Sequence, residues 1–198
     1  MSGNTAALSP LTNFHHVAYR CRDAAETRAF YEGVLGLPLA IALDFTEVSG
    51  TDAKLEYMHL FFRLEDGNFI AFFDAPDSVR PDHFKKQSGF NRHLAFETKS
   101  MAALDDYLAR LKANGVDYWG PLDHGFVKSI YFYDPNGINL EITCRTAEYD
   151  SILLHEAEQK EPAMSAWTER TRDKKEQRLR PLPPGSIEST QTGEKRNG

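Results

Sequence analysis

The sequence predicts an α+β fold built from two copies of one unit, each a strand, a helix and three further strands. A short phrase occurs twice, as His-Val-Ala-Tyr at residues 16–19 and as His-Leu-Ala-Phe at residues 93–96. Each phrase precedes a helical pattern, and each unit ends in an apolar run after a turn, at residues 66–67 and at residues 134–137. Self-similarity of this kind indicates an internal duplication.

In the first copy, residues 14–20 favour a strand because they are rich in β-branched and aromatic side chains. A helix follows, since Asp23 can cap its free amides. Gly36 is placed to end that helix in the left-handed conformation. Residues 57–64 and 69–73 are predicted to be two strands of a hairpin.

The second copy repeats this order. A strand starts at His93, and a helix over residues 101–113 has Ser100 as its N-cap and Asn-Gly at residues 114–115 as its end. Three further strands are predicted, near residue 118, over residues 127–133 and over residues 138–143.

The predicted organisation has four parts along the chain. They are a leader over residues 1–13, a globular domain over residues 14–146 with units at about 14–74 and 90–146, an arm over residues 147–180 and a tail over residues 181–198. The arm is rich in charged residues and is expected to be helical or partly ordered. It is either a solvated extension or a clamp on a second subunit. The tail starts with prolines, has little apolar content and is expected to be disordered.

Composition and charge exclude several classes of partner. The 198 residues are 41% hydrophobic, and the net charge of -6 gives no electrostatic reason to approach nucleic acid or an anionic membrane. No apolar stretch approaches the roughly 20 residues of a membrane-spanning helix, and the polar start lacks a signal-peptide core. A cytoplasmic protein with small organic substrates is therefore expected. Cys21 and Cys144 are expected to be reduced thiols that pack as small hydrophobes.

The two copies differ at a position that bears on function. Four residues beyond the closing glycine of each turn lies Ala71 in the first copy and Glu141 in the second. The duplication therefore supplies His16, His93 and Glu141 as candidate metal ligands. Two imidazoles and one carboxylate with open coordination positions have the composition of a non-haem Fe(II) site. Burying the carboxylate in an apolar strand without a partner would be unfavourable.

These features resemble the vicinal oxygen chelate superfamily, which includes glyoxalases, bleomycin resistance proteins and type I extradiol dioxygenases. The resemblance rests on the duplicated unit, the paired histidine phrases and the run Asp-Pro-Asn-Gly-Ile-Asn-Leu-Glu at residues 134–141, and it covers about residues 14–144. His124 and Tyr131 are spaced from this run as in the extradiol signature, although Leu122 departs from that pattern.

The resemblance implies that two βαβββ modules form a curled mixed sheet around a metal-binding cup. It places His16, His93 and Glu141 at the base of the cup, with Fe(II) as the expected metal and Mn(II), Zn(II) or Ni(II) as alternatives. It also implies that His124 and Tyr131 are catalytic residues, which hydrogen-bond substrate and oxygen intermediates.

The usual acid-base histidine of extradiol dioxygenases is missing from its place shortly before Ala71, and His59 is the candidate substitute. Aligning the two hairpins on their closing glycines pairs Phe61 with Tyr131, and His59 lies two residues before Phe61 on the same strand face. A histidine titrates near pH ~6.5, which suits acid-base catalysis. A purely structural role for His59 is the alternative.

The sequence therefore predicts an Fe(II)-dependent extradiol-type dioxygenase that cleaves a catechol-like or hydroquinone-like aromatic with dioxygen. Homodimer formation is left open. One alternative is a glyoxalase-like isomerase or lyase, in which the metal polarises a carbonyl group. The other is a non-enzymatic resistance protein that binds a small molecule in a cup without metal.

Overall fold

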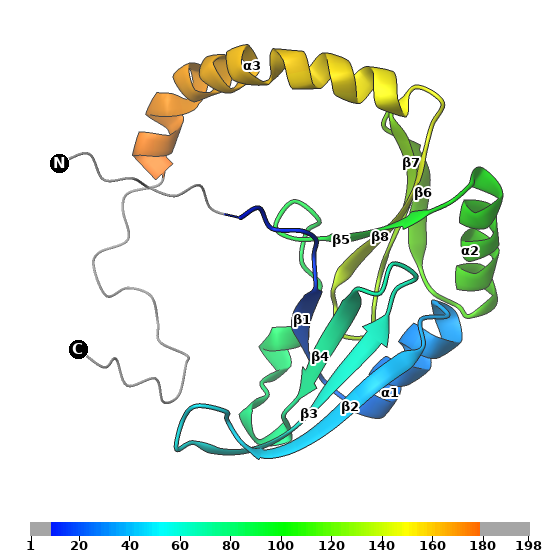
Figure 1. Cartoon of the computed structure of the whole chain (residues 1–198), viewed down its shortest axis with the longest axis vertical. Helices are drawn as coiled ribbons and strands as arrows, with labels where there is room; N and C mark the ends of the chain where they lie inside the picture. The colour runs from blue at the N-terminus through cyan, green and yellow to red at the C-terminus, as the bar shows by residue number, and fades with distance from the viewer. Residues whose placement is uncertain (1–8, 179–198) are drawn as a thin grey trace. The chain divides into compact units, whose positions relative to one another are not determined.

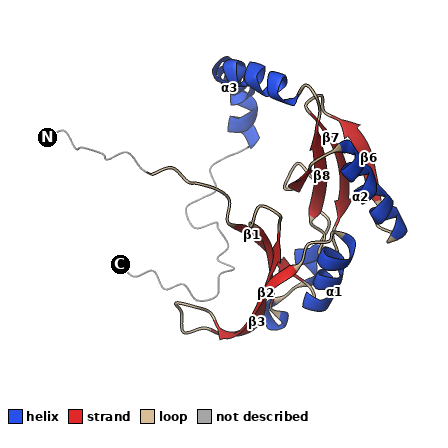
Figure 2. Ribbon diagram, turned by 45° about the vertical axis from the view of Figure 1, so that its right-hand side comes forward, coloured by secondary structure: helices blue, strands red, loops and turns tan. Residues whose placement is uncertain are grey.

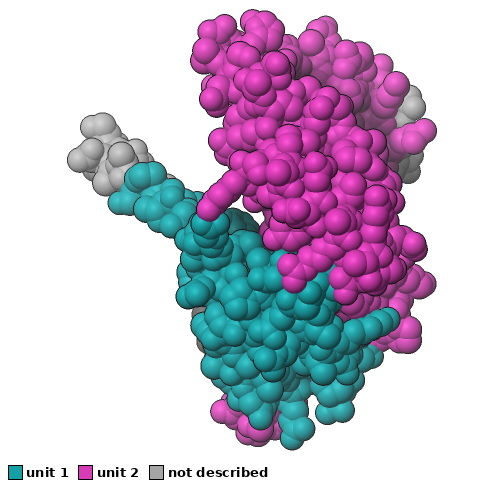
Figure 3. Space-filling view, turned by 90° about the vertical axis from the view of Figure 1, so that its right-hand side faces the viewer, with its two compact units in different colours: residues 1–45, 56–79 teal, residues 46–55, 80–198 magenta. Residues whose placement is uncertain are grey.

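The computed structural model describes residues 9–178, which fall into two compact units (Figure 3). Unit 1 takes residues up to 45 together with 56–79, and unit 2 takes residues 46–55 together with 80 onward. Each unit has one four-stranded mixed sheet with a helix, so the predicted α+β class is confirmed. The predicted boundaries of leader, domain and arm stay predictions, and the tail at residues 181–198 lies outside the described residues.

Unit 1 has the strand order β1-β4-β3-β2, in which β4 pairs in parallel with β1 and antiparallel with β3 (Figure 1). The strands are β1 His16–Cys21, β2 Leu39–Glu47, β3 Lys54–Arg63 and β4 Phe69–Asp74. Helix α1, Ala24–Arg28, begins at the predicted cap, where the Asp23 carboxylate accepts a hydrogen bond from the Glu26 amide at 2.7 Å.

Helix α1 continues as a π-helical segment, Ala29–Val34, and the chain then turns at Gly36 with φ 74°. This segment buries Tyr31, whose ring lies 5.1 Å from that of Phe62 and 4.8 Å from that of Phe72. Side chains alternate along a strand, so the helix side of the sheet is the core and the opposite face carries the candidate site residues.

Unit 2 has the strand order β5-β8-β7-β6. Its elements are β5 Leu94–Thr98, α2 Met101–Ala113, β6 Tyr118–Asp123, β7 Val127–Tyr133 and β8 Asn139–Arg145. Helix α2 and strand β7 have the predicted bounds, and Ser100 caps α2 by accepting a hydrogen bond from the Ala103 amide. Helix α2 lies along one face of this sheet (Figure 2). Two short 3-10 helices, Pro76–Ser78 and Pro81–Phe84, lie between β4 and β5.

The strand registers confirm the correspondence predicted between the two copies. The parallel pairs are Ala18 with Ala71 and Ala95 with Glu141, and the antiparallel pairs are Phe61 with Ala71 and Tyr131 with Glu141. Ala71 and Glu141 therefore hold the same place in their sheets.

Residues of the predicted arm form helix α3, Tyr149–Arg178. The helix is anchored at its first residue, because the Tyr149 ring contacts Phe126 and lies 4.2 Å from the Arg145 guanidinium. Most of its later side chains are exposed. In the described part of the chain, no helix is both long and apolar enough to cross a bilayer.

Both cysteines are free and buried, as the sequence predicts. Burial raises the pKa of the Cys21 thiol to about 12, so this group stays protonated and packs as an apolar side chain.

Candidate active site

Unit 2 brings two of the three predicted metal ligands together. Nε2 of His93 lies 3.3 Å from Oε2 of Glu141. Nδ1 of His93 lies 2.8 Å from the carbonyl oxygen of Gly89, and since a carbonyl only accepts, Nδ1 carries the proton and donates it. In the neutral ring, Nε2 then presents its lone pair to the Glu141 carboxylate. Two such acceptors side by side need a cation, which is either a proton on Nε2 or a metal ion.

The donor set fits a metal ion. Ligand atoms held at about 2.1 Å from one ion lie roughly 3 Å apart, which is close to the separation between His93 and Glu141. A ligand histidine commonly donates its other ring N–H to a backbone carbonyl, as His93 does to Gly89. The Glu141 side chain is only 9% exposed whereas that of His93 is 45% exposed, so a ligand could reach the pair from the histidine side.

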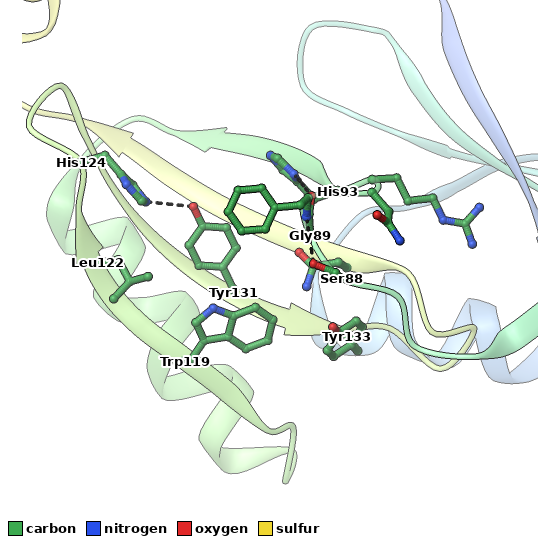
Figure 4. A pocket seen from close by; sticks show the side chains of 12 residues that line it. Ser88, Gly89, His93, Trp119, Leu122, His124, Tyr131 and Tyr133 are labelled. Carbon is green, nitrogen blue, oxygen red and sulfur yellow. Dashed lines mark hydrogen bonds between the residues drawn. The ribbon is translucent and has the colours of Figure 1, made fainter. Parts of the chain in front are cut away.

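Tyr131 and His124 lie beside Glu141 on the same wall. Tyr131 is the cross-strand partner of Glu141, and its hydroxyl lies 2.9 Å from Nε2 of His124 (Figure 4). Burial raises the pKa of Tyr131, and the negative charge of Glu141 raises it further. Tyr131 therefore keeps its proton at neutral pH and can donate it in the hydrogen bond to His124. These two predicted catalytic residues do come together.

A cavity of about 830 Å³ opens next to this wall. His93, His124 and Tyr131 line it, and Trp119 forms an aromatic side by stacking on Tyr131 with ring centroids 5.5 Å apart (Figure 4). Glu141 lines a neighbouring cavity of about 430 Å³, to which His124 and Tyr131 also belong. The pair His124 and Tyr131 thus borders both spaces, and both spaces are of a size for a small molecule.

Unit 1 places His16, His59 and Phe61 on one sheet face. The His16 ring centroid lies 5.6 Å from that of Phe61 and 6.5 Å from that of His59. His59 therefore shares the face of Phe61, as predicted. Its ring stacks on Phe73 at 3.8 Å, and within the described residues its buried Nε2 has no hydrogen-bond partner. Burial lowers the pKa of His59, and the neighbouring His16 lowers it further.

The complete ligand set stays a prediction. Among residues 9–178, no cluster of three or more His, Cys, Asp or Glu side chains is arranged to hold an ion. His16 is described within unit 1 only, whereas His93 and Glu141 are both in unit 2.

Three residues near the site were not predicted from the sequence as functional candidates, namely Gly89, Trp119 and Asn139. Strand alternation could have found Asn139, because it lies two residues before Glu141 and so on the same face. The position of Trp119 opposite Tyr131 depends on the β6–β7 register, and the Gly89 carbonyl depends on a turn.

Two βαβββ units with a histidine and a glutamate paired on one open sheet define the class of the protein. The chain belongs to the Glyoxalase/Bleomycin resistance protein/Dioxygenase superfamily, whose family model matches residues 13–142. It is similar to Glyoxylase I 4 of Arabidopsis thaliana, with 28% identity over 138 residues that make up 67% of this chain and 70% of the relative.

The chain is also similar in fold to solved structures of other proteins. A glyoxalase/dioxygenase from Nostoc punctiforme is 27% identical, with TM-score 0.53 and coverage of 71% of this chain and 97% of the other. The fosfomycin resistance protein FosX from Listeria monocytogenes is 25% identical, with TM-score 0.51 and coverage of 71% and 98%. A second FosX crystal structure, 24% identical with TM-score 0.50 and coverage of 73% and 98%, is a complex with Mn(II) and sulfate.

Proposed function

We propose that this protein is a metal-dependent dioxygenase of the extradiol type, which opens the ring of a catechol-like or hydroquinone-like aromatic with dioxygen. The observation that carries the proposal is the hydrogen bond between Tyr131 and His124 beside Glu141, on the wall of an aromatic-lined cavity. Such a pair can hold and pass a proton next to a bound diol.

His93 and Glu141 would hold the metal from unit 2, and His16 is proposed as the third ligand. Fe(II) is the proposed metal, with Mn(II), Zn(II) or Ni(II) as alternatives; Mn(II) is the ion in the FosX complex. When bound, the ion would polarise the substrate oxygens, and iron would also provide the redox chemistry that dioxygen requires.

The chain's own residues would bind and orient the substrate. Trp119 and Tyr131 offer stacked aromatic surfaces at the cavity wall, which suits a planar ring. The Tyr131 hydroxyl can donate a hydrogen bond to a substrate oxygen when it is not donating to His124. His124 can then take up or return the proton that a substrate hydroxyl gains or loses.

A glyoxalase-like isomerase or lyase is the second candidate, favoured by the similarity to Glyoxylase I 4. Proton transfer by a carboxylate in such an enzyme needs an acidic group near the metal. Unit 1 has Ala71 at the position that Glu141 takes in unit 2. Strands β1, β3 and β4 pair with one another around Ala71. On the face of Ala71, their paired positions carry histidine, arginine, alanine and phenylalanine side chains and no carboxylate. These positions of unit 1 therefore supply no further carboxylate besides the proposed ligand Glu141, and this supports the dioxygenase proposal.

Oxygen consumption separates these two functions. Protein loaded anaerobically with Fe(II) is expected to take up dioxygen when catechols are added, and to form a yellow ring-opened product in proportion to the oxygen consumed. Protein loaded with Zn(II) is the control and should leave the catechols unchanged, because zinc has no redox chemistry. Metal-dependent conversion of a carbonyl substrate without oxygen uptake would instead establish the isomerase, and a wild-type protein that binds no metal would favour the resistance-type binding protein.

His59→Phe tests the proposed proton shuttle. The variant is expected to keep its metal and to lower kcat by roughly 10²- to 10⁴-fold, the usual contribution of a positioned acid-base group. Phenylalanine preserves the stacking on Phe73 and removes only the ring nitrogens. Metal content and oxygen uptake are the two measurements. A kcat equal to that of the wild type would show that His59 is a packed strand residue.

A further inference from the structure

Asn139 is a buried amide that the fold leaves without partners. It is the first residue of β8 and is 1% exposed. Neither its Oδ1 nor its Nδ2 has a hydrogen-bond partner among the residues that the structure describes. Burying an amide without hydrogen bonds destabilises a protein, so such groups are rare and occur where a ligand, a water molecule or a function accounts for them.

The fold can satisfy a buried asparagine close by. Asn136, in the turn before β8, is 2% exposed, and its side-chain amide donates to Oδ2 of Asp134 at 3.0 Å. The two asparagines are three residues apart and equally buried, yet of the two only Asn136 has a hydrogen-bond partner for its side chain among residues 9–178. The lack of partners at Asn139 is therefore a property of its position and not of this region of the fold.

That position is on the site face. Asn139 pairs with Tyr133 across the β7–β8 ladder, two residues along from the pair of Tyr131 and Glu141. Two residues along a strand span about 7 Å, which is close to the length of a benzene ring with a substituent at each end. The same cavity is lined by Asn139, His93 and Trp119.

The described residues around Asn139 do not use its amide as a hydrogen-bond partner, so the amide could bind a ligand. The Tyr133 hydroxyl already donates to the Gln87 carbonyl at 2.9 Å. Gly89 passes directly over the amide, and a Cβ at residue 89 would lie 3.3 Å from Oδ1 of Asn139. The turn that contains Gly89 also carries Phe90, whose side chain is fully exposed. Asn139 is one of the residues that line the cavity of about 830 Å³, together with Gly89 and Phe90.

We infer that Asn139 is a specificity-determining residue, which binds an uncharged substituent that both donates and accepts hydrogen bonds, such as a carboxamide, on the far side of the substrate ring. The inference rests on the proposed function for the reacting end of the substrate, which lies at His93 and Glu141. A carboxamide matches both atoms of the asparagine amide, because it accepts from Nδ2 and donates to Oδ1.

Benzamide and acetophenone are the probes for this inference. They have nearly the same shape, but only benzamide donates a hydrogen bond, and neither can undergo ring opening. The chain has two tryptophans, so Trp167→Phe leaves Trp119 as the single indole reporter at the cavity. Titration of Trp119 fluorescence in this background is expected to show benzamide binding about tenfold more tightly than acetophenone. Asn139→Leu should reduce this ratio to about one.

Thermal unfolding of the same variants supplies a second readout. Asn139→Leu keeps the branched shape of the side chain and removes the unpartnered amide. Because the free-energy cost of burying that amide is then lost, Tm should rise by a few degrees. Asn136→Leu is the matched control and should lower Tm, because it breaks existing hydrogen bonds.

The outcomes distinguish this inference from the proposed function, since neither probe needs metal or dioxygen. A ratio of about one in the wild-type background, or no saturable binding of either probe, would overturn the role of Asn139. A lowered Tm in Asn139→Leu with an unchanged ratio would also overturn it and would assign the amide to a structural water. Absence of oxygen uptake would leave the probe ratio, and so the inference, unaffected.

Discussion

Glu141→Ala and His93→Ala are each expected to cost the protein its divalent metal. The two side chains supply the donor atoms that lie 3.3 Å apart in unit 2. Removal of either leaves one donor of this pair, and even changes to groups that only support a ligand weaken metal binding by about 10- to 100-fold. Elemental analysis of protein purified in the presence of Fe(II) measures the effect, with occupancy expected to fall from near stoichiometric to roughly a tenth or less.

Glu97→Ala is the matched control for this experiment. Glu97 lies on the neighbouring strand β5, and its carboxylate is already paired with the Arg145 guanidinium at 2.7 Å. Its removal should leave metal occupancy unchanged. His16→Ala extends the test to unit 1, because loss of metal there supports the three-ligand site. Stoichiometric metal in both the Glu141 and His93 variants would show that the pair is only a hydrogen-bonded contact.

The elements predicted best from the sequence are those with local signals. Helix α2 has an N-cap at Ser100 and an Asn-Gly end, and both boundaries agree with the structure. The equivalence of Ala71 and Glu141 was also predictable, because a duplication aligns two copies without knowledge of their packing. Such features depend on a few neighbouring residues or on an internal comparison.

Features that depend on tertiary packing could not be predicted. The helix expected after Asp23 changes to a π-helical segment at Ala29–Val34, and this segment buries Tyr31 against Phe62 of the sheet. His59 was placed on the correct face, but the burial of its Nε2 follows from the aromatic rings stacked around it.

In the candidate site, too, some features follow from local sequence signals and others depend on tertiary packing. The pairing of Tyr131 with Glu141 follows from strand register, which the turn glycine fixes in the sequence. The orientation of the His93 ring follows from the Gly89 carbonyl, which a turn brings back to the histidine four residues later. Residue types and spacing therefore identified the candidate donors, whereas the proton position on His93 came only from the structure.

His124→Phe is expected to keep the metal and to slow ring opening by roughly 10²- to 10⁴-fold, because it removes one partner of the hydrogen bond at 2.9 Å between His124 and Tyr131. Tyr131→Phe removes the other partner of the same bond and should have a similar effect. If the two residues act as one unit, the double variant should be no slower than the worse single variant.

Oxygen uptake by Fe(II)-loaded protein gives kcat for each variant, and elemental analysis confirms that the metal remains. His83→Phe is the control for loss of a histidine, since His83 lies in the 3-10 helix Pro81–Phe84 and not among the residues of either cavity. A His124 variant with wild-type kcat would mean that this histidine only orders the β6–β7 loop. A double variant slower by the product of both single effects would mean that Tyr131 and His124 act on the substrate separately, so that their hydrogen bond is not the catalytic unit.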